Sequence, residues 1–133
     1  MDVTLNHTIV WCRDKSVSAG YLTEILGLPA AKGWGPFMIV EMGNGVSLDY
    51  HVFGEPDGEI CSQHSAFLVS EQGFDEALGW IEARGQQYWA DPGLTAGGRI
   101  NRRDGGRGVY FEDPDGHVME LITRPYGSGG ATT

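Results

Sequence analysis

The chain has 133 residues, is rich in glycine (21 residues) and carries a formal net charge of −9 at pH 7. This length suits one domain with a sizeable core, and the acidic charge argues against a general nucleic-acid-binding role, which needs a basic surface. The sequence has no apolar run of about 18 residues and no visible signal peptide, so we expect a cytoplasmic protein with no membrane association.

The first half of the chain begins with patterns that predict a strand followed by a helix. Side chains alternate over residues 4–12, which places His7 on one face of a strand together with other large side chains. Asp14 is a suitable N-cap, apolar residues from Val17 onward then recur at helical spacing, and Gly27 is a suitable helix end. A short extended piece over residues 28–32 is expected next.

A hairpin is predicted to close the first half. Asn44-Gly45 is the strongest short hairpin signal in the chain, and it joins strands expected over residues 37–42 and 46–53. If the loop has two residues, Asp49 lies on the face of the sheet that a helix does not cover. Its neighbours on that face are then Ser47, His51, Met38, Val40 and Met42.

The second half repeats this order after a predicted linker at residues 55–60. Residues 62–69 alternate as a strand, and apolar residues at helical spacing then predict a helix that ends at Gly85. Trp89 lies in a second short extended piece. A loop rich in glycine and arginine covers residues 92–107, and we expect its arginines either to face solvent or to gate a substrate.

The last hairpin is the most informative stretch of the sequence. Residues 113–116 (Asp-Pro-Asp-Gly) have the composition of a tight turn, because proline fixes φ, aspartate bonds to nearby backbone and glycine tolerates positive φ. In the strand that follows, Glu120 shares a face with Val118 and Ile122. A lone buried carboxylate is costly, so we expect Glu120 to be paired, neutral or bound to a metal.

The two halves have the same order of elements: strand, helix, short strand and hairpin. The sequence therefore predicts an α+β fold built from two βαβββ repeats. Within one domain spanning residues 1–133, we expect the repeats over about 1–54 and 61–125 and a loose tail over about 126–133. Each predicted first strand contains a histidine, His7 or His64, and each last strand contains a carboxylate, Asp49 or Glu120.

The duplicated unit, its histidines and the pattern Tyr110-x-x-Asp113-Pro114-x-Gly116-x-x-x-Glu120 resemble the vicinal oxygen chelate superfamily. This group includes glyoxalase I, extradiol dioxygenases, fosfomycin-resistance transferases and bleomycin-binding proteins. The resemblance covers the chain to about residue 124. It implies that the two repeats form a cupped mixed sheet with one helix per repeat outside, that the cup holds a small-molecule substrate or ligand, and that the protein is a homodimer.

The resemblance also implies a divalent metal ion, whose identity stays open among Fe, Mn, Zn, Ni and Mg. Its ligands are expected at His7, His64 and Glu120. Two imidazoles and one carboxylate leave coordination positions free for a chelating substrate. A divalent ion in such a site polarises a carbonyl, stabilises an enediolate or activates water.

Several further residues have alternative roles. Asp49 stands where glyoxalase I supplies a fourth ligand. It is either a ligand, an acceptor that orients an imidazole, a base that moves a proton at the substrate, or an exposed side chain. His51 is its alternative on the same predicted face. Tyr110 either contacts substrate or packs in the core. His117 is expected to be exposed to solvent.

Large apolar side chains are candidates either for lining the cup or for the ordinary core. They are Trp11, Trp34, Phe37, Met38, Val40, Met42 and Trp89. Cys12 and Cys61 lack a metal-binding spacing, and both are expected to be buried free thiols.

The sequence supports two functions. The first is a small metal-dependent enzyme, a lyase, isomerase or dioxygenase, that acts on a compact oxygenated substrate with Asp49 and Tyr110 at the catalytic centre. A family histidine expected upstream of Tyr110 is replaced in residues 101–104 (Asn-Arg-Arg-Asp), which argues against catechol cleavage. The second is a metal-free protein that binds a cationic or flat drug, as bleomycin-resistance proteins do, favoured by the negative charge and the aromatic residues.

Overall fold

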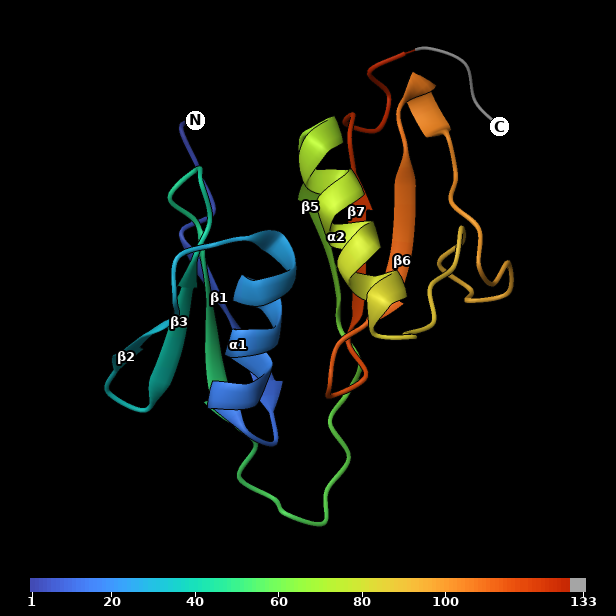
Figure 1. Ribbon diagram of the computed structural model, residues 1–133. Helices are drawn as coiled ribbons and strands as arrows, with labels where there is room; N and C mark the ends of the chain where they lie inside the picture. The colour runs from blue at the N-terminus through green and yellow to red at the C-terminus, as the bar shows by residue number, and fades with distance from the viewer. Residues whose placement is uncertain (130–133) are drawn as a thin grey trace. The chain divides into compact units, whose positions relative to one another are not determined.

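The computed structural model describes residues 1–129, which form two compact units, Met1–Cys61 and the chain from Ser62 onward (Figure 1). Each unit consists of one α-helix and one small mixed sheet. Among the described residues, no helix is long and apolar enough to cross a membrane. The final part of the predicted tail, residues 130–133, lies outside the described residues.

The first unit contains β1(His7–Cys12), α1(Lys15–Leu26), β2(Lys32–Trp34), β3(Phe37–Glu41) and β4(Ser47–Val52). Its sheet order is β1-β4-β3-β2, with β1 parallel to β4 and the other neighbours antiparallel. Helix α1 packs on β3 and β4. The predicted order of elements is confirmed, although β1 begins at His7 rather than at residue 4.

Helix α1 begins and ends as predicted. The Asp14 side chain accepts hydrogen bonds from the backbone N–H groups of Ser16 and Val17 at 3.0 and 3.2 Å, and Gly27 ends the helix at a φ of +62°. Val17 was expected on the apolar face but is 56% exposed. Tyr21 and Ile25 are buried as expected, and Ser18 is buried in place of Val17, because one residue along an α-helix turns the side chain by about 100°.

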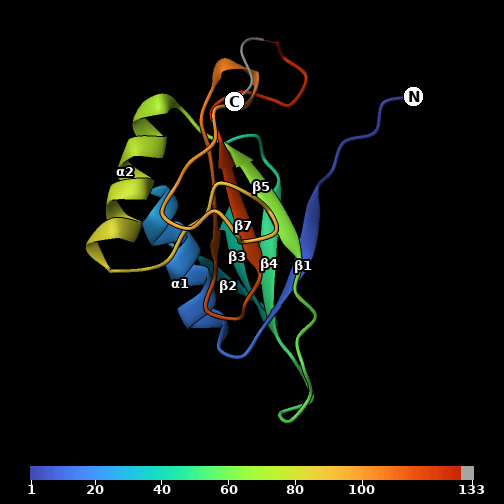
Figure 2. The ribbon, with the colours of Figure 1, turned by 90° about the vertical axis from the view of Figure 1, so that its right-hand side faces the viewer.

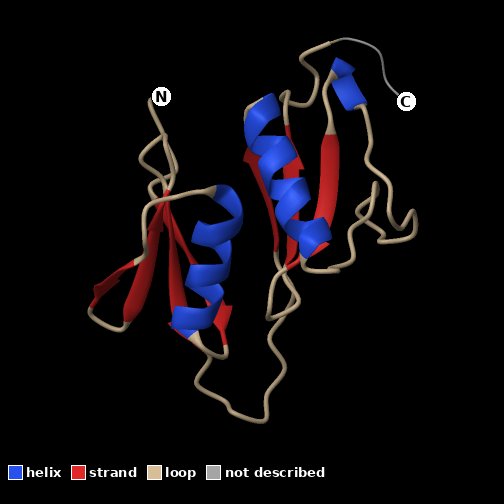
Figure 3. Cartoon of the chain, in the orientation of Figure 1, coloured by secondary structure: helices blue, strands red, loops and turns tan. Residues whose placement is uncertain are grey.

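The second unit contains β5(His64–Leu68), α2(Glu71–Ala83), a 3₁₀ turn at Arg103–Gly105, β6(Gly108–Glu112) and β7(Val118–Ile122). Its sheet order is β5-β7-β6, with β5 parallel to β7. The segment between α2 and β6 is mostly loop (Figure 3). Within it Trp89 exchanges two backbone hydrogen bonds with Tyr110, at 2.9 and 2.8 Å, so a single bridge stands where the first unit has β2. The α+β fold with two βαβββ-like repeats is confirmed.

Helix α2 covers one face of the second sheet and leaves the other face uncovered (Figure 2). The helix contributes Phe74, Ala77 and Ile81 to the buried core. The sheet contributes alternate side chains that are also buried, namely Val109, Phe111, Met119 and Leu121. Because side chains alternate along a strand, Tyr110 and Glu120 point to the face of the sheet that α2 does not cover.

The duplication extends to the register of the strands. In each unit the first-strand histidine pairs with the residue two positions before the carboxylate of the last strand. His7 therefore shares a sheet face with Asp49, and His64 shares a face with Glu120. The two repeats place the same two chemical groups at equivalent positions.

The first hairpin differs from the prediction by one residue. Ile39 pairs with Asp49, and the loop comprises residues 43–45, where Gly45 takes a φ of +84°. A shift of one residue moves every side chain of a strand to the other face. The β3 side chains on the face of Asp49 are therefore Phe37, Ile39 and Glu41, in place of Met38, Val40 and Met42.

The structure corrects two expected exposures. His117 was expected in solvent but is 1% exposed. The turn places its ring next to the residue before β5, and its Nδ1 accepts a hydrogen bond from the backbone N–H of Gln63 at 3.0 Å. The backbone N–H of His117 donates to the carboxylate of Asp113 at 2.9 Å. Cys12 is buried as expected, whereas Cys61, just before the second unit begins, is exposed.

One arginine of the 92–107 loop ties the loop to helix α2. The Arg107 guanidinium forms ion pairs with Glu71 at 2.8 Å and with Asp75 at 2.7 Å. It also lies over the ring of Phe74, 4.5 Å from the centroid. Arg107 is therefore not a free solvent-facing side chain; it ties helix α2 to the start of β6.

This cluster predicts a pH-dependent contribution to stability. Hydrogen bonds from Thr123 and Arg107 hold the pKa of Glu71 below its usual value. The carboxylate therefore stabilises the fold above its unfolded pKa, and this contribution is lost as the pH falls through the lower folded value. Glu71→Gln is expected to reduce the free energy of unfolding at pH 7 by less than about 1 kcal/mol, since the pair is exposed.

Urea unfolding at neutral pH and at about pH 3 tests this expectation, because the difference between Glu71→Gln and wild type is expected to shrink in acid. Glu59→Gln, an exposed position in the first unit, is the control. A difference of the same size at both pH values would contradict the assignment.

Candidate metal and substrate site

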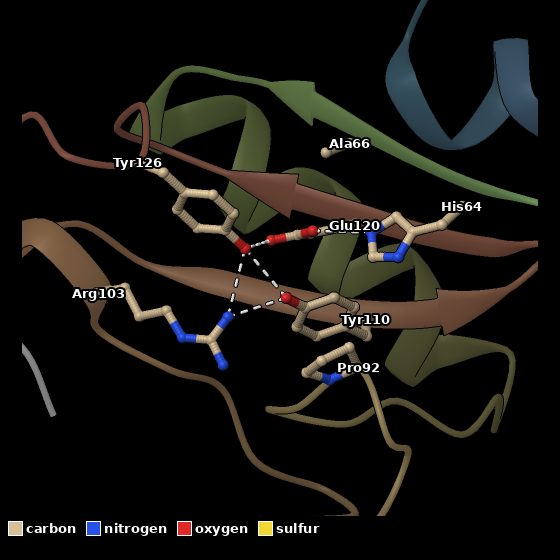
Figure 4. A pocket seen from close by; sticks show the side chains of 7 residues that line it. All are labelled: His64, Ala66, Pro92, Arg103, Tyr110, Glu120 and Tyr126. Atoms are coloured by element: carbon tan, nitrogen blue, oxygen red, sulfur yellow. Dashed lines mark hydrogen bonds and ion pairs between the residues drawn. The ribbon is translucent and has the colours of Figure 1, made fainter.

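An open pocket lies on the face of the second sheet that α2 does not cover (Figure 4). Its volume is about 650 Å³. Apart from Ala66, three lining residues come from the strands, two from the loop before β6 and one from the segment after β7. The lining is completed by a small side chain on β5, so that the full set is His64, Ala66, Pro92, Arg103, Tyr110, Glu120 and Tyr126.

Glu120 lies at the centre of this pocket because β7 is the central strand of the sheet. Its register partners are Ala66 on β5 and Tyr110 on β6. The carboxylate is 2% exposed, and the small side chain of Ala66 leaves it accessible from the pocket. The burial predicted from the strand pattern is therefore present, and so is a partner for each oxygen.

Both carboxylate oxygens of Glu120 are hydrogen-bonded. Oε1 lies 2.8 Å from Nε2 of His64, and Oε2 accepts a hydrogen bond from the hydroxyl of Tyr126. An ionised carboxylate only accepts hydrogen bonds, so Nε2 of His64 carries a proton in this arrangement and Tyr126 is the donor. Two of the predicted metal ligands, His64 and Glu120, are thus brought together directly.

Arg103 and Tyr110 extend this network. Nη1 of Arg103 donates to the hydroxyl of Tyr110 at 2.9 Å and to that of Tyr126 at 3.3 Å, and the two hydroxyl oxygens are 3.0 Å apart. Because Tyr126 gives its proton to Glu120, Tyr110 donates to Tyr126. Desolvation of its hydroxyl, reinforced by the bond to Glu120, raises the pKa of Tyr126 well above its usual value.

Tyr110 is both buried and part of the pocket. The residue is 1% exposed, and its ring meets that of His64 edge-on at 5.7 Å between centroids. Tyr110 is therefore tightly packed and also lines the pocket. Whether Tyr110 touches substrate stays a prediction.

The remaining predicted residues belong to the first unit. His7 is exposed, and its Nδ1 is hydrogen-bonded to Asn6 at 2.7 Å. Asp49 is 8% exposed and accepts a hydrogen bond from Ser47 Oγ at 2.8 Å. His51 bonds through Nδ1 to the Val52 carbonyl at 2.9 Å. The roles of His7 and Asp49 in a metal set stay predictions.

Two of the aromatic candidates for the cup lie against His51 in the first unit. Its ring centroid is 5.1 Å from Trp11 and 5.1 Å from Phe37. Trp34, another candidate for the cup, is 70% exposed, whereas Val40 is fully buried. The apolar candidates therefore divide between the open sheet face, the solvent and the core.

The pair formed by His64 and Glu120 fits a divalent ion. Two ligands bound at about 2.1 Å and at right angles lie about 3 Å apart, close to the 2.8 Å between Nε2 and Oε1. Imidazole nitrogen with carboxylate oxygen suits iron, manganese, nickel and zinc. Among residues 1–129 no group of three His, Cys, Asp or Glu side chains converges. Of the predicted metal ligands, the structure therefore brings together only His64 and Glu120.

The sequence did not point to Tyr126, and it pointed to Arg103 only as one of the arginines of its loop. Arg103 belongs to the loop whose arginines were expected to face solvent or gate a substrate, and Tyr126 belongs to the segment expected as a loose tail. Neither lies in a periodic pattern, and each reaches the site through contacts with distant segments. A tyrosine shortly after the last strand was the only available signal.

Residues 4–121 match the model of the Glyoxalase/Bleomycin resistance protein/Dioxygenase superfamily. The chain belongs to this superfamily. The family resemblance inferred from the sequence is thereby confirmed over nearly the whole chain.

Within the superfamily, the chain is similar to several enzymes. It is 56% identical to the oxidase ChaP-H2, with a TM-score of 0.92 over 98% of this chain and 100% of that chain. It is 53% identical to the oxidase ChaP-H1, with a TM-score of 0.90 over 95% and 99%. It is also 30% identical to the glutathione transferase FosA of Serratia marcescens over 121 residues, 89% of this chain and 79% of that protein.

The network predicts an energetic coupling between Arg103 and Tyr110. A hydrogen bond from a charged group is worth about 1.5–3 kcal/mol, so the double-mutant cycle of Arg103→Met and Tyr110→Phe is expected to show a coupling of about 1 kcal/mol or more. Urea unfolding of the four proteins measures it. Arg102→Met, at the adjacent exposed position, is the control, and additivity of the first pair would contradict the network.

Proposed function

We propose that the protein is a divalent-metal-dependent oxidase that uses dioxygen to oxidise a small substrate bound through neighbouring oxygen atoms. The observation that carries this proposal is the approach of His64 Nε2 to Glu120 Oε1, 2.8 Å apart, in an open pocket. Identities of 56% and 53% to two oxidases support oxidation over the other reactions of the superfamily.

We assign the metal set to His7, His64 and Glu120. Two histidines and one carboxylate are typical of non-haem Fe(II) enzymes, so iron is the first candidate. An ion held there would supply Lewis acidity toward the substrate oxygens and a redox partner for dioxygen. Metal binding through Nε2 requires His64 to give up the proton that it shares with Glu120.

Residues of the pocket wall are assigned to the substrate. Arg103 presents guanidinium N–H donors beside Tyr110 in the pocket wall, and such donors suit a substrate oxygen that carries partial or full negative charge. Tyr110 is assigned to contact the same substrate. Asp49, on the same sheet face as His7, is assigned to accept a proton from a substrate hydroxyl. This assignment favours a hydroxylated substrate that is acidic.

Metal content tests the ligand assignment. Protein purified without a metal-binding tag is expected to contain about one ion per chain, and His7→Ala, His64→Ala and Glu120→Ala are expected to reduce the content to about a tenth or less. His51→Ala and Glu112→Ala, a histidine and a glutamate outside the assigned set, are the matched controls. Metal content that none of the three ligand variants alters would remove the basis of the proposal.

Dioxygen consumption tests the reaction class. Hydroxylated aromatic compounds and hydroxyketones are the substrates to screen, and consumption is expected to stop with Glu120→Ala and with chelator. Isomerisation of a hemithioacetal without dioxygen uptake would instead indicate a glyoxalase.

Light scattering of the same samples tests the predicted homodimer.

The drug-binding alternative makes a different prediction. Its support is the net charge of −9, which attracts cationic ligands. Quenching of tryptophan fluorescence by a cationic drug, unchanged by chelator and without any turnover, would favour this alternative.

A further inference from the structure

The segment at residues 124–129, here called the C-terminal strap, carries Tyr126 into the pocket (Figure 4). Asp104 holds the strap: its carboxylate accepts hydrogen bonds from the N–H groups of Gly127 at 3.1 Å and Gly129 at 3.2 Å. Asp104 follows Arg103, whose guanidinium reaches the Tyr126 hydroxyl at 3.3 Å. One 3₁₀ turn therefore fixes both the backbone of the strap and its tyrosine.

We propose that Tyr126 is a positioning residue that restricts Glu120 to binding the metal through one oxygen. The inference rests on the proposed function, because it concerns how Glu120 presents itself to an ion. The hydroxyl of Tyr126 holds Oε2, while Oε1 faces His64. An ion that takes the place of the shared proton meets Oε1 alone.

The hydroxyl of Tyr126 has one orientation available to it. Its oxygen accepts hydrogen bonds from Arg103 at 3.3 Å and from Tyr110 at 3.0 Å. Its single proton is directed at Glu120, because an ionised carboxylate only accepts hydrogen bonds. Three groups on three separate segments thus fix the position of one carboxylate oxygen.

Packing does not account for Tyr126. The residue is 54% exposed, so its ring contributes little to the core, whereas its hydroxyl lies inside the hydrogen-bond network. An exposed ring with an engaged hydroxyl indicates a role for the hydroxyl itself. Removing that one atom is therefore a mild change to the fold and a specific change to the site.

Single-oxygen binding has a consequence for the substrate. A carboxylate that binds through both oxygens fills one more position of an octahedral ion than a carboxylate that binds through one. A substrate that chelates through two oxygens, together with dioxygen, needs every position that two histidines and a single carboxylate oxygen leave open. Tyr126 would keep the last of these positions free.

Tyr126→Phe tests the inference, with Co²⁺ as a spectroscopic probe of coordination in the full chain. We expect a changed visible absorption spectrum and a Kd for Co²⁺ about tenfold weaker, the usual cost of losing a group that orients a ligand. Tyr88→Phe is the matched control, because the Tyr88 hydroxyl also donates to a glutamate, Glu82 at 3.1 Å, outside the pocket. A wild-type Co²⁺ spectrum in Tyr126→Phe overturns the inference, whatever its Kd.

A second variant tests the support that the strap gives. Asp104 touches neither Glu120 nor His64. Asp104→Ala is expected to change the visible absorption spectrum of bound Co²⁺ in the same way as Tyr126→Phe does, and combining the two substitutions is expected to cause no further change. Additive changes would overturn the role of the strap. If His64→Ala and Glu120→Ala leave Co²⁺ binding unaltered, the proposed function fails; if they abolish it while Tyr126→Phe behaves as wild type, only this inference fails.

Discussion

Burying a carboxylate is costly unless hydrogen bonds compensate it, and at Glu120 both oxygens have a hydrogen-bond partner. An unpaired buried charge costs several kcal/mol or shifts its pKa. The central strand β7 places Glu120 where β5 supplies His64 and the C-terminal strap supplies Tyr126. The same imidazole and the same carboxylate oxygen are the groups that a divalent ion requires. Satisfying the fold and preparing the site are therefore one arrangement.

The opposite face of the second sheet gives this arrangement its rigidity. Helix α2 fills that face with buried apolar side chains, and the loop that carries Arg103 is fastened to the helix through Arg107. Arg103 can therefore hold two hydroxyl groups with little cost in loop ordering. The first unit repeats the register of histidine and carboxylate but gives Asp49 a serine as its partner. The repeat thus offers two similar positions whose carboxylates have different hydrogen-bond partners.

Local patterns predicted most of the fold, and contacts between distant segments account for what was missed. The N-cap Asp14, the helix end at Gly27 and the turn at residues 113–116 are each decided within a few residues, so composition reveals them. The burial of Glu120 followed from strand alternation alone. The first hairpin was misregistered because Asn-Gly does not specify whether the loop has two or three residues. Tyr126 could not be predicted, because its position depends on Asp104 and Arg103, which approach it only in the folded chain.

The unequal accessibility of the two thiols has a practical consequence. Cys12 lies in the core of the first unit, whereas Cys61 is exposed at the end of that unit. A maleimide spin label or dye would therefore react selectively at the junction of the two repeats in the natural sequence. A paramagnetic distance measurement from that point would restrict how far a bound ion lies from Cys61, without any engineered cysteine.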